Sequence, residues 1–277
     1  MIVLTSEQHN EIAAVPELAA LAPSSTLAPQ NVYEFLCLSA QHNCAKSFLG
    51  VLPQAHFNLG AITLLARYNA VEIAKQWSAP CNERDWKNAM RRAAKSGHWD
   101  FARYVLTQCD TMDVRKAALS GACMGDQASF LEHMLPHAND PGFCNHLSTL
   151  AAQHNAKNCM RVLLPGMTHR VWCSALSVAL FQEDAALTNM MLENAPGGEV
   201  DPQWATKMAL RALLGKCKDP EPLLRFLFQH ITADDILLHQ GYIPPPIQDV
   251  VRTVYQNMLL TSATENATGL IRKPKKI

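Results

Sequence analysis

An alanine followed three residues later by a residue suited to end a helix recurs seven times in this chain. In six of the seven cases that partner is glycine or asparagine, the residue types that adopt the left-handed conformation beyond a helix end with little steric cost. The alanines are Ala40, Ala66, Ala94, Ala122, Ala152, Ala179 and Ala212, and their partners are Asn43, Asn69, Gly97, Gly125, Asn155, Gln182 and Gly215. Because this helix stop returns about every 29 residues, the sequence predicts a stack of similar units, a solenoid.

The residues around each alanine indicate that one unit is a pair of helices. Positions eight and four residues before the alanine fall on the same helical face as the alanine itself, and many of them are apolar. Positions eight and twelve residues after it form the apolar face of a second helix. The predicted fold class is therefore all-α, an α-solenoid of about seven helix–turn–helix repeats. We expect helices to end within two residues of Asn43, Asn69, Gly97, Gly125, Asn155 and Gly215.

The third and fifth units carry a more specific pattern. Residues 93–106 contain an alanine pair, two variable residues, Gly97-His98 and an apolar run that ends in Leu106, and residues 150–164 are similar with Asn155 in place of the glycine. This pattern resembles the ankyrin repeat, which implies a protein-binding solenoid. No unit has the Thr-Pro-Leu-His opening of that family or the segment that builds its β-hairpin fingers. Whether fingers are present is left open, and bare helical hairpins of the tetratricopeptide or HEAT type are the alternative.

Four regions follow from where the repeat pattern begins and ends. We expect residues 1–30 to be a flexible leader, because the segment from Ala22 to Gln30 is rich in Ser, Thr, Pro and Ala. Ankyrin-like repeats should occupy residues 31–230. A C-terminal cap with a helix from about Ile247 to Leu260 is expected over residues 231–261, since solenoids need their last unit covered. Residues 262–277 should form a basic, disordered tail.

Charge and cysteine content exclude some classes of function. Lys plus Arg equals Asp plus Glu at 24 each, so nothing global indicates a nucleic-acid partner. The nine cysteines include no Cys-x-x-Cys pair, which favours a reducing compartment without disulfides. We find no membrane span or secretory signal pattern, and the expected location is cytoplasmic. The tail Arg272-Lys273-Pro274-Lys275-Lys276 fits a short nuclear-import signal only weakly.

Two stretches were weighed as sites of chemistry. The sequence Gly121-Ala-Cys-Met-Gly125 has the spacing of a nucleophile elbow, but it lies in an expected helix, whereas the elbow needs a preceding strand. Four further residues could supply a tetrahedral zinc site, namely His133, His137, Cys144 and His146. However, Pro136 interrupts the helix that would align His133 with His137. We therefore expect no catalytic residues, no metal and no cofactor.

A basic and aromatic patch is the strongest candidate for binding. Eight Lys and Arg residues lie between Arg84 and Lys116 against four acids, and the next forty residues contain no Lys or Arg. Arginine and tryptophan dominate interface hot spots, and we expect Trp99 to be exposed because it follows a helix stop. The predicted partner-binding residues are Arg91, Arg92, Lys95, His98, Trp99 and Arg103.

These features predict a monomeric, non-enzymatic scaffold that binds a protein partner. The degenerate repeats, with an acidic leader and a basic tail, also resemble bacterial effector proteins delivered into a host cell. Nucleic-acid binding by the basic patch is disfavoured by the neutral net charge. The competing hypothesis is an enzyme that uses the repeats to recognise its substrate, with Cys and His chemistry in units four to six or in the cap.

Overall fold

The computed structural model describes residues 2–23, 26–55, 60–77, 80–137, 141–196, 200–213, 220–239 and 245–267. In this part of the chain 79% of the residues are helical, in 18 α-helices and four short 3-10 helices. Its strands are two dipeptides, β1 (Ile2–Val3) and β2 (Thr26–Leu27), which pair antiparallel. The all-α prediction is confirmed.

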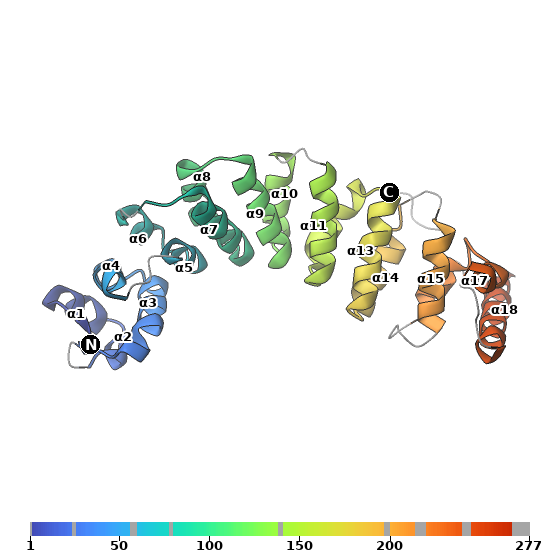
Figure 1. Ribbon diagram of the computed structural model, residues 1–277, viewed down its shortest axis with the longest axis horizontal. Helices are drawn as coiled ribbons and strands as arrows, with labels where there is room; N and C mark the ends of the chain where they lie inside the picture. Colours follow the sequence, from blue (N-terminus) through green and yellow to red (C-terminus); the bar gives the residue numbers. More distant parts are fainter. Residues whose placement is uncertain are drawn as a thin grey trace. The chain divides into compact units, whose positions relative to one another are not determined.

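The chain divides into two compact units, residues 1–162 and 163–277. Helices follow one another in pairs along both units, and Figure 1 labels most of the α-helices. The helices that begin in the first unit are α1 (Ser6–Ala13), α2 (Pro16–Leu21), η1 (Pro29–Asn31), α3 (Val32–Gln41), α4 (Ala45–Val51), η2 (Leu52–Ala55), α5 (Ala61–Arg67), α6 (Val71–Gln76), α7 (Glu83–Ser96), α8 (Trp99–Gln108), α9 (Met112–Met124), α10 (Ala128–Met134), η3 (Leu135–His137), α11 (Pro141–Gln153) and α12 (Lys157–Leu163).

The second unit contains two further pairs and two terminal helices. Its helices are η4 (Leu164–Gly166), α13 (His169–Phe181), α14 (Ala185–Glu193), α15 (Pro202–Leu213), α16 (Glu221–Leu227), α17 (Ala233–His239) and α18 (Pro245–Ala267). Trp172 is completely buried in its core, and the indole Nε1 donates a hydrogen bond to the Met191 carbonyl at 3.0 Å. Trp204 and Phe226 pack against the same ring.

One turn repeats after the first helix of six successive pairs. A residue with positive φ follows the helix, and the next backbone N–H donates to a carbonyl five residues earlier, which is the hydrogen bond of a Schellman motif. The left-handed residues are Asn43, Asn69, Gly97, Asp126, Asn155 and Glu183. The six hydrogen bonds run from Cys44, Ala70, His98, Gln127, Ala156 and Asp184 to Ser39, Leu65, Ala93, Ala122, Ala151 and Ala179, over 2.7–3.3 Å.

The expected helix ends are confirmed at Asn43, Asn69, Gly97, Gly125 and Asn155, each within two residues of a helix terminus. Gly215 lies outside the described residues.

The assignment of the left-handed position was wrong in the fourth and sixth pairs. Gly125 has φ −112° and Gln182 has φ −83°, whereas the following Asp126 and Glu183 have φ 53° and 55°. In these pairs the repeated alanine itself accepts the hydrogen bond of the turn, whereas in the other four pairs the residue before the alanine accepts it, so the turn comes one residue later.

Gly125 is instead needed for close packing of α7 and α9, the most extensive helix contact in the first unit. A Cβ at Gly125 would overlap the backbone carbonyl of Lys95, and a Cβ at Gly121 would overlap that of Arg91. Ala94 completes the contact from the α7 side. The Gly121-to-Gly125 stretch therefore packs the C-terminal end of α9 against α7, and a helix precedes it, as expected, where a nucleophile elbow would need a strand.

The side chain of a left-handed residue also bonds to the next pair. Asn69 Oδ1 accepts the backbone N–H of Phe101 in the first turn of α8, at 3.1 Å. Asp126 Oδ1 accepts that of Cys159 in the first turn of α12, at 2.9 Å. Both acceptors satisfy an N–H that a helix start leaves without an intrahelical partner. These bonds tie each turn to the neighbouring pair.

The expectation of a flexible leader over residues 1–30 was wrong for its described part. Helices α1 and α2 bury Ile12 and Leu18 completely, and Leu27 is buried on β2. Glu11 accepts hydrogen bonds from the backbone N–H groups of Lys46 and Ser47, at 3.1 and 2.6 Å, in the first turn of α4. The low apolar content of residues 22–30 suggested flexibility, but Ile12 of α1 and Leu18 of α2, before this segment, are buried.

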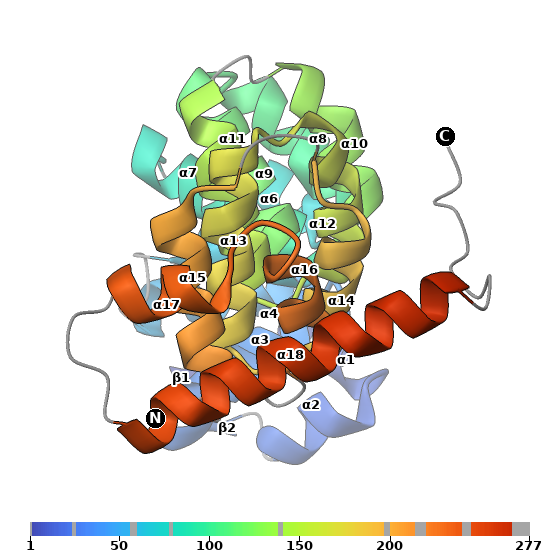
Figure 2. The same cartoon turned by 90° about the vertical axis from the view of Figure 1, so that its right-hand side faces the viewer.

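The C-terminal region also differs from the expectation. The capping helix, predicted over residues 247–260, is α18 and extends from Pro245 to Ala267, through the first residues of the expected disordered tail. Figure 2 shows α18 against α15 and α17, and Val251 is buried there. Residues 268–277, with the basic cluster, lie outside the described residues.

We predict that Gly125→Ala and Gly121→Ala each destabilise the protein by about 1–3 kcal/mol, because an added methyl overpacks a backbone-to-backbone contact. Gly125 already has negative φ, so the cost is steric. The measurement is urea unfolding followed by circular dichroism. Gly166→Ala is the control, since a Cβ there meets nothing within 4 Å. Equal stability of all three variants would contradict the packing role.

The turn predicts a graded response at Asn69. Asn69→Gly keeps a residue suited to φ 56° and loses only the hydrogen bond to Phe101, at about 0.5–1.5 kcal/mol. Asn69→Ala also places an unfavourable residue in the left-handed conformation, which adds about 1 kcal/mol. The free energies of unfolding from urea titrations should rank wild type above Gly and Gly above Ala. An alanine variant at least as stable as the glycine variant would refute this account.

Candidate ligand-binding groove

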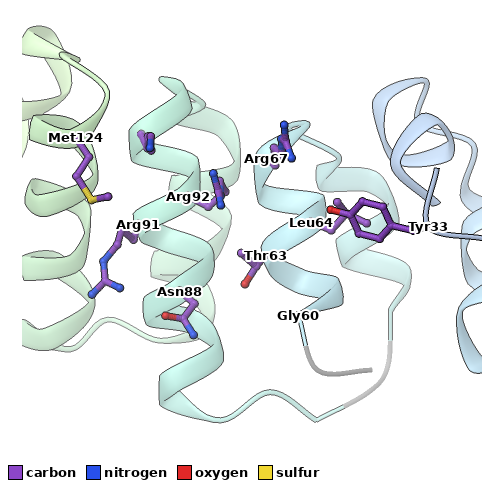
Figure 3. Close-up of a pocket in the computed structure, with 10 residues that line it drawn as sticks. Tyr33, Gly60, Thr63, Leu64, Arg67, Asn88, Arg91, Arg92 and Met124 are labelled. Atoms are coloured by element: carbon purple, nitrogen blue, oxygen red, sulfur yellow. The ribbon is translucent and has the colours of Figure 1, made fainter. Parts of the chain in front are cut away.

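A groove of about 370 Å³ lies on the first helices of the pairs in unit one. Figure 3 shows the residues that line it, which come from α3, α5, α7 and α9. They are Tyr33, Gly60, Thr63, Leu64, Arg67, Asn88, Arg91, Arg92, Lys95 and Met124. Four of the ten are cations and none is an acid, so the groove presents positive charge.

Helix α7 supplies most of this charge because its two faces have different tasks. Ala89, Met90, Ala93 and Ala94 are buried against α5 and α9. The intervening positions lie on the other face, and they hold Asn88, Arg91, Arg92 and Lys95. In Figure 3 Arg91 lies on the α9 side of α7, as Met124 does, while Arg92 lies on the side of α5. The capping box between Asn82 and Asp85 fixes the start of α7.

The groove cations differ from other basic residues of the patch in their pairing. Lys87 pairs with Asp113 at 2.8 Å, and Arg115 pairs with Asp110 at 2.7 Å through two parallel hydrogen bonds. Hydrogen bonding to Arg115 holds the pKa of the Asp110 carboxyl below its usual range. In the part of the chain that the structure describes, Arg67, Arg91, Arg92 and Lys95 form no ion pair.

Polar and apolar groups accompany these cations. Leu64, in the middle of α5, is 6% exposed, and Met124 and the half-exposed Tyr33 ring add apolar surface. Thr63 and Asn88 supply hydrogen-bonding side chains. The Arg67 guanidinium lies 5.5 Å from the centre of the Tyr68 ring. A ligand with oxyanions and a small apolar group matches this lining.

Three of the six predicted binding residues, Arg91, Arg92 and Lys95, meet in the groove, and the other three lie on α8 or at its start. His98 Nε2 contacts the Arg67 carbonyl at 2.9 Å, so this imidazole satisfies the end of α5. Arg103 is exposed and lies 4.0 Å from Asp100.

The expectation that Trp99 is exposed was wrong. Its ring stacks on Phe130 with centroids 4.0 Å apart, and His133 meets it edge-on at 5.1 Å. Because the short loop after α7 directs the start of α8 toward the next pair, Trp99 packs α8 against α10. Sequence reasoning also missed Arg67 and Tyr33, which come from earlier pairs; the repeat spacing alone could have placed Arg67 near α7.

The cysteine and histidine residues considered for chemistry are dispersed or buried. Cys123 and Cys159 are completely buried, and a hydrogen bond with Cys123, together with burial, raises the pKa of the Cys159 thiol. His133 and His137 have ring centres 6.3 Å apart. Among the described residues no group of three or more His, Cys, Asp or Glu side chains could hold a metal ion.

Three comparisons, with protein-family models, with curated proteins and with solved structures, found no match to this chain. In the described ranges no helix is both long and apolar enough to cross a membrane.

We predict that alkylation by iodoacetamide distinguishes the cysteines. Burial raises the pKa of the Cys173 thiol to about 11, with a smaller effect of Asp201, and only the thiolate reacts. Near about pH 8 the folded protein should therefore be modified at half-buried Cys109 well before Cys123, Cys159 or Cys173. Peptide mass spectrometry gives the order, and urea-unfolded protein is the control for equal labelling. Rapid labelling of folded Cys123 would restore the hypothesis of a reactive thiol.

Proposed function

We propose that this chain is a non-enzymatic scaffold that binds a protein partner through the groove on α3, α5, α7 and α9. The observation that carries the proposal is the set of four cations without ion pairs in the described residues, gathered from two helices at one place. A folded protein gains nothing in stability from like charges held together, so a site that gathers them is suited to an external anion.

The repeat geometry supports the same function. Six successive pairs of helices are closed by the same Schellman turn, and α5, α7, α9 and α11 contact one another in sequence. We propose that these pairs are repeats of an ankyrin-like solenoid, a class that binds through residues not needed for stacking. The likeness rests on the helix–turn–helix core, because in the described residues the only strands are β1 and β2 and no hairpin finger follows a pair.

The competing proposal of an enzyme has less support. Among the described cysteines of units four to six, Cys123, Cys159 and Cys173 are buried and Cys144 is half-buried. The groove lining contains neither cysteine nor histidine. It holds positioning groups, such as arginine and asparagine, without a group suited to abstract a proton near neutral pH.

The first test is affinity purification of the full chain, followed by mass spectrometry and by calorimetry with each purified partner. The groove variant is Arg91→Gln with Arg92→Gln. The matched control, Lys75→Gln with Arg84→Gln, removes the same charge from exposed residues outside the groove. Trp99→Ala is unsuitable, because loss of its stacking on Phe130 would change stability as well as any contact.

We expect the groove variant to bind the partner about 2 kcal/mol or more less tightly, roughly a thirtyfold loss of affinity. The control variant should bind with nearly the affinity of wild type. Thermal unfolding must show that both variants remain folded. A partner that binds all three proteins with affinities within twofold would show that the interaction uses another surface. That result would overturn the assignment of the groove.

A further inference from the structure

We infer that the occupant of the groove is a short acidic segment of the partner polypeptide, bound in an extended form. This inference rests on the proposed function and specifies the chemistry of the same site. The ten lining residues include four cations and no carboxylate. A bound anion would therefore meet attraction from four groups and repulsion from no lining side chain.

The type of cation favours carboxylates. Three of the four are arginines, Arg67, Arg91 and Arg92, and a guanidinium donates two parallel hydrogen bonds to a planar carboxylate. The pair Arg115–Asp110 shows this arrangement within the same unit, with N–O distances of 2.7 Å. Arg91 and Arg92 have no such partner in the described residues, and acidic side chains of a second protein would complete the same geometry.

The length of the groove limits the segment. Asn88 and Lys95 lie seven residues apart on α7, which corresponds to about 10 Å along the helix axis. An extended polypeptide advances about 3.3 Å per residue, so about three residues span this distance. Carboxylates can face the cations of α5 and α7, while Leu64 on the α5 side and Met124 on the α9 side provide apolar surface beside them (Figure 3).

The surroundings favour a peptide over a nucleic acid. Beyond the groove, acids lie beside the basic residues, as in the pairs Lys87–Asp113 and Arg103–Asp100, so a phosphate backbone leaving the groove would meet both signs. Tyr33 is also the one aromatic residue in the lining, whereas single-stranded nucleic acids need a series of stacking rings.

The test measures fluorescence anisotropy with the full chain and a labelled peptide in which Glu-Glu pairs flank a central phenylalanine. The comparison peptide has glutamine at every glutamate, and a short single-stranded DNA is the third probe. Each probe is titrated with wild type, with Arg91→Gln/Arg92→Gln and with the matched control Lys75→Gln/Arg84→Gln. Circular dichroism verifies that the variants keep the helical content of wild type.

We expect wild type to bind the glutamate peptide saturably and to bind the glutamine peptide about tenfold or more weakly. The groove variant should bind the glutamate peptide about tenfold or more weakly than wild type does, and the matched control should bind it within twofold of wild type. Raising the salt concentration should weaken binding of the glutamate peptide, because the cations are partly exposed. Equal loss in both double variants would show a general charge effect and overturn the inference. Tighter binding of DNA than of the glutamate peptide would also overturn it.

Failure of this inference differs from failure of the proposed function. If no acidic peptide binds but a purified partner loses affinity in the groove variant, the groove binds a folded or non-acidic surface. In that outcome the scaffold proposal stands and the acidic-segment inference is wrong. If the peptide binds at the groove while natural partners ignore the groove variant, the peptide site exists and the function assigned to it is wrong.

Discussion

The left-handed residue after the first helix of a pair is the constraint on which the fold depends. It reverses the chain within about three residues, and the hydrogen bond that spans five residues satisfies a carbonyl that the helix end would leave free. Because the same turn closes six successive pairs, it sets a nearly constant length for each pair. Asn69 and Asp126 add a second effect, since their side chains fix the start of a helix in the next pair.

Regular turns place the first helices of unit one side by side, and this arrangement creates the groove. Helix α7 packs between α5 and α9 and buries its alanine and methionine face there. Gly121 and Gly125 let α9 approach closely enough to contact the α7 backbone at Arg91 and Lys95. The cations of α7 are thereby held next to Met124 on one side and Arg67 on the other. One face of α7 is buried in the unit, and the opposite face lines the groove proposed to bind a partner.

Local chemistry made part of this predictable from the sequence. Residue type and spacing, which act over one or two helical turns, predict the helical class and five helix ends. They also predict that Arg91, Arg92 and Lys95 lie close together. The remainder depends on contacts between pairs. Trp99 was misplaced because its partner, Phe130, lies in the next pair. Arg67 was missed because it lies outside the basic stretch from Arg84 to Lys116, although its repeat position, equivalent to that of Lys95, indicates that it lies near α7. Gly125 was explained by its conformation when its neighbour Lys95 was decisive.

The contact between Glu11 and α4 changes where the first unit must be taken to begin. Repeat spacing would start the fold near residue 31, but the N–H groups of Lys46 and Ser47 find their acceptor on α1, and the Gln8 amide donates to the Lys46 carbonyl. Removing α1 and α2 would leave these groups to water and would expose the surface of α4 that packs against α1. Helices α1 and α2 therefore belong to the folded body of the first unit, and its boundary precedes Thr5.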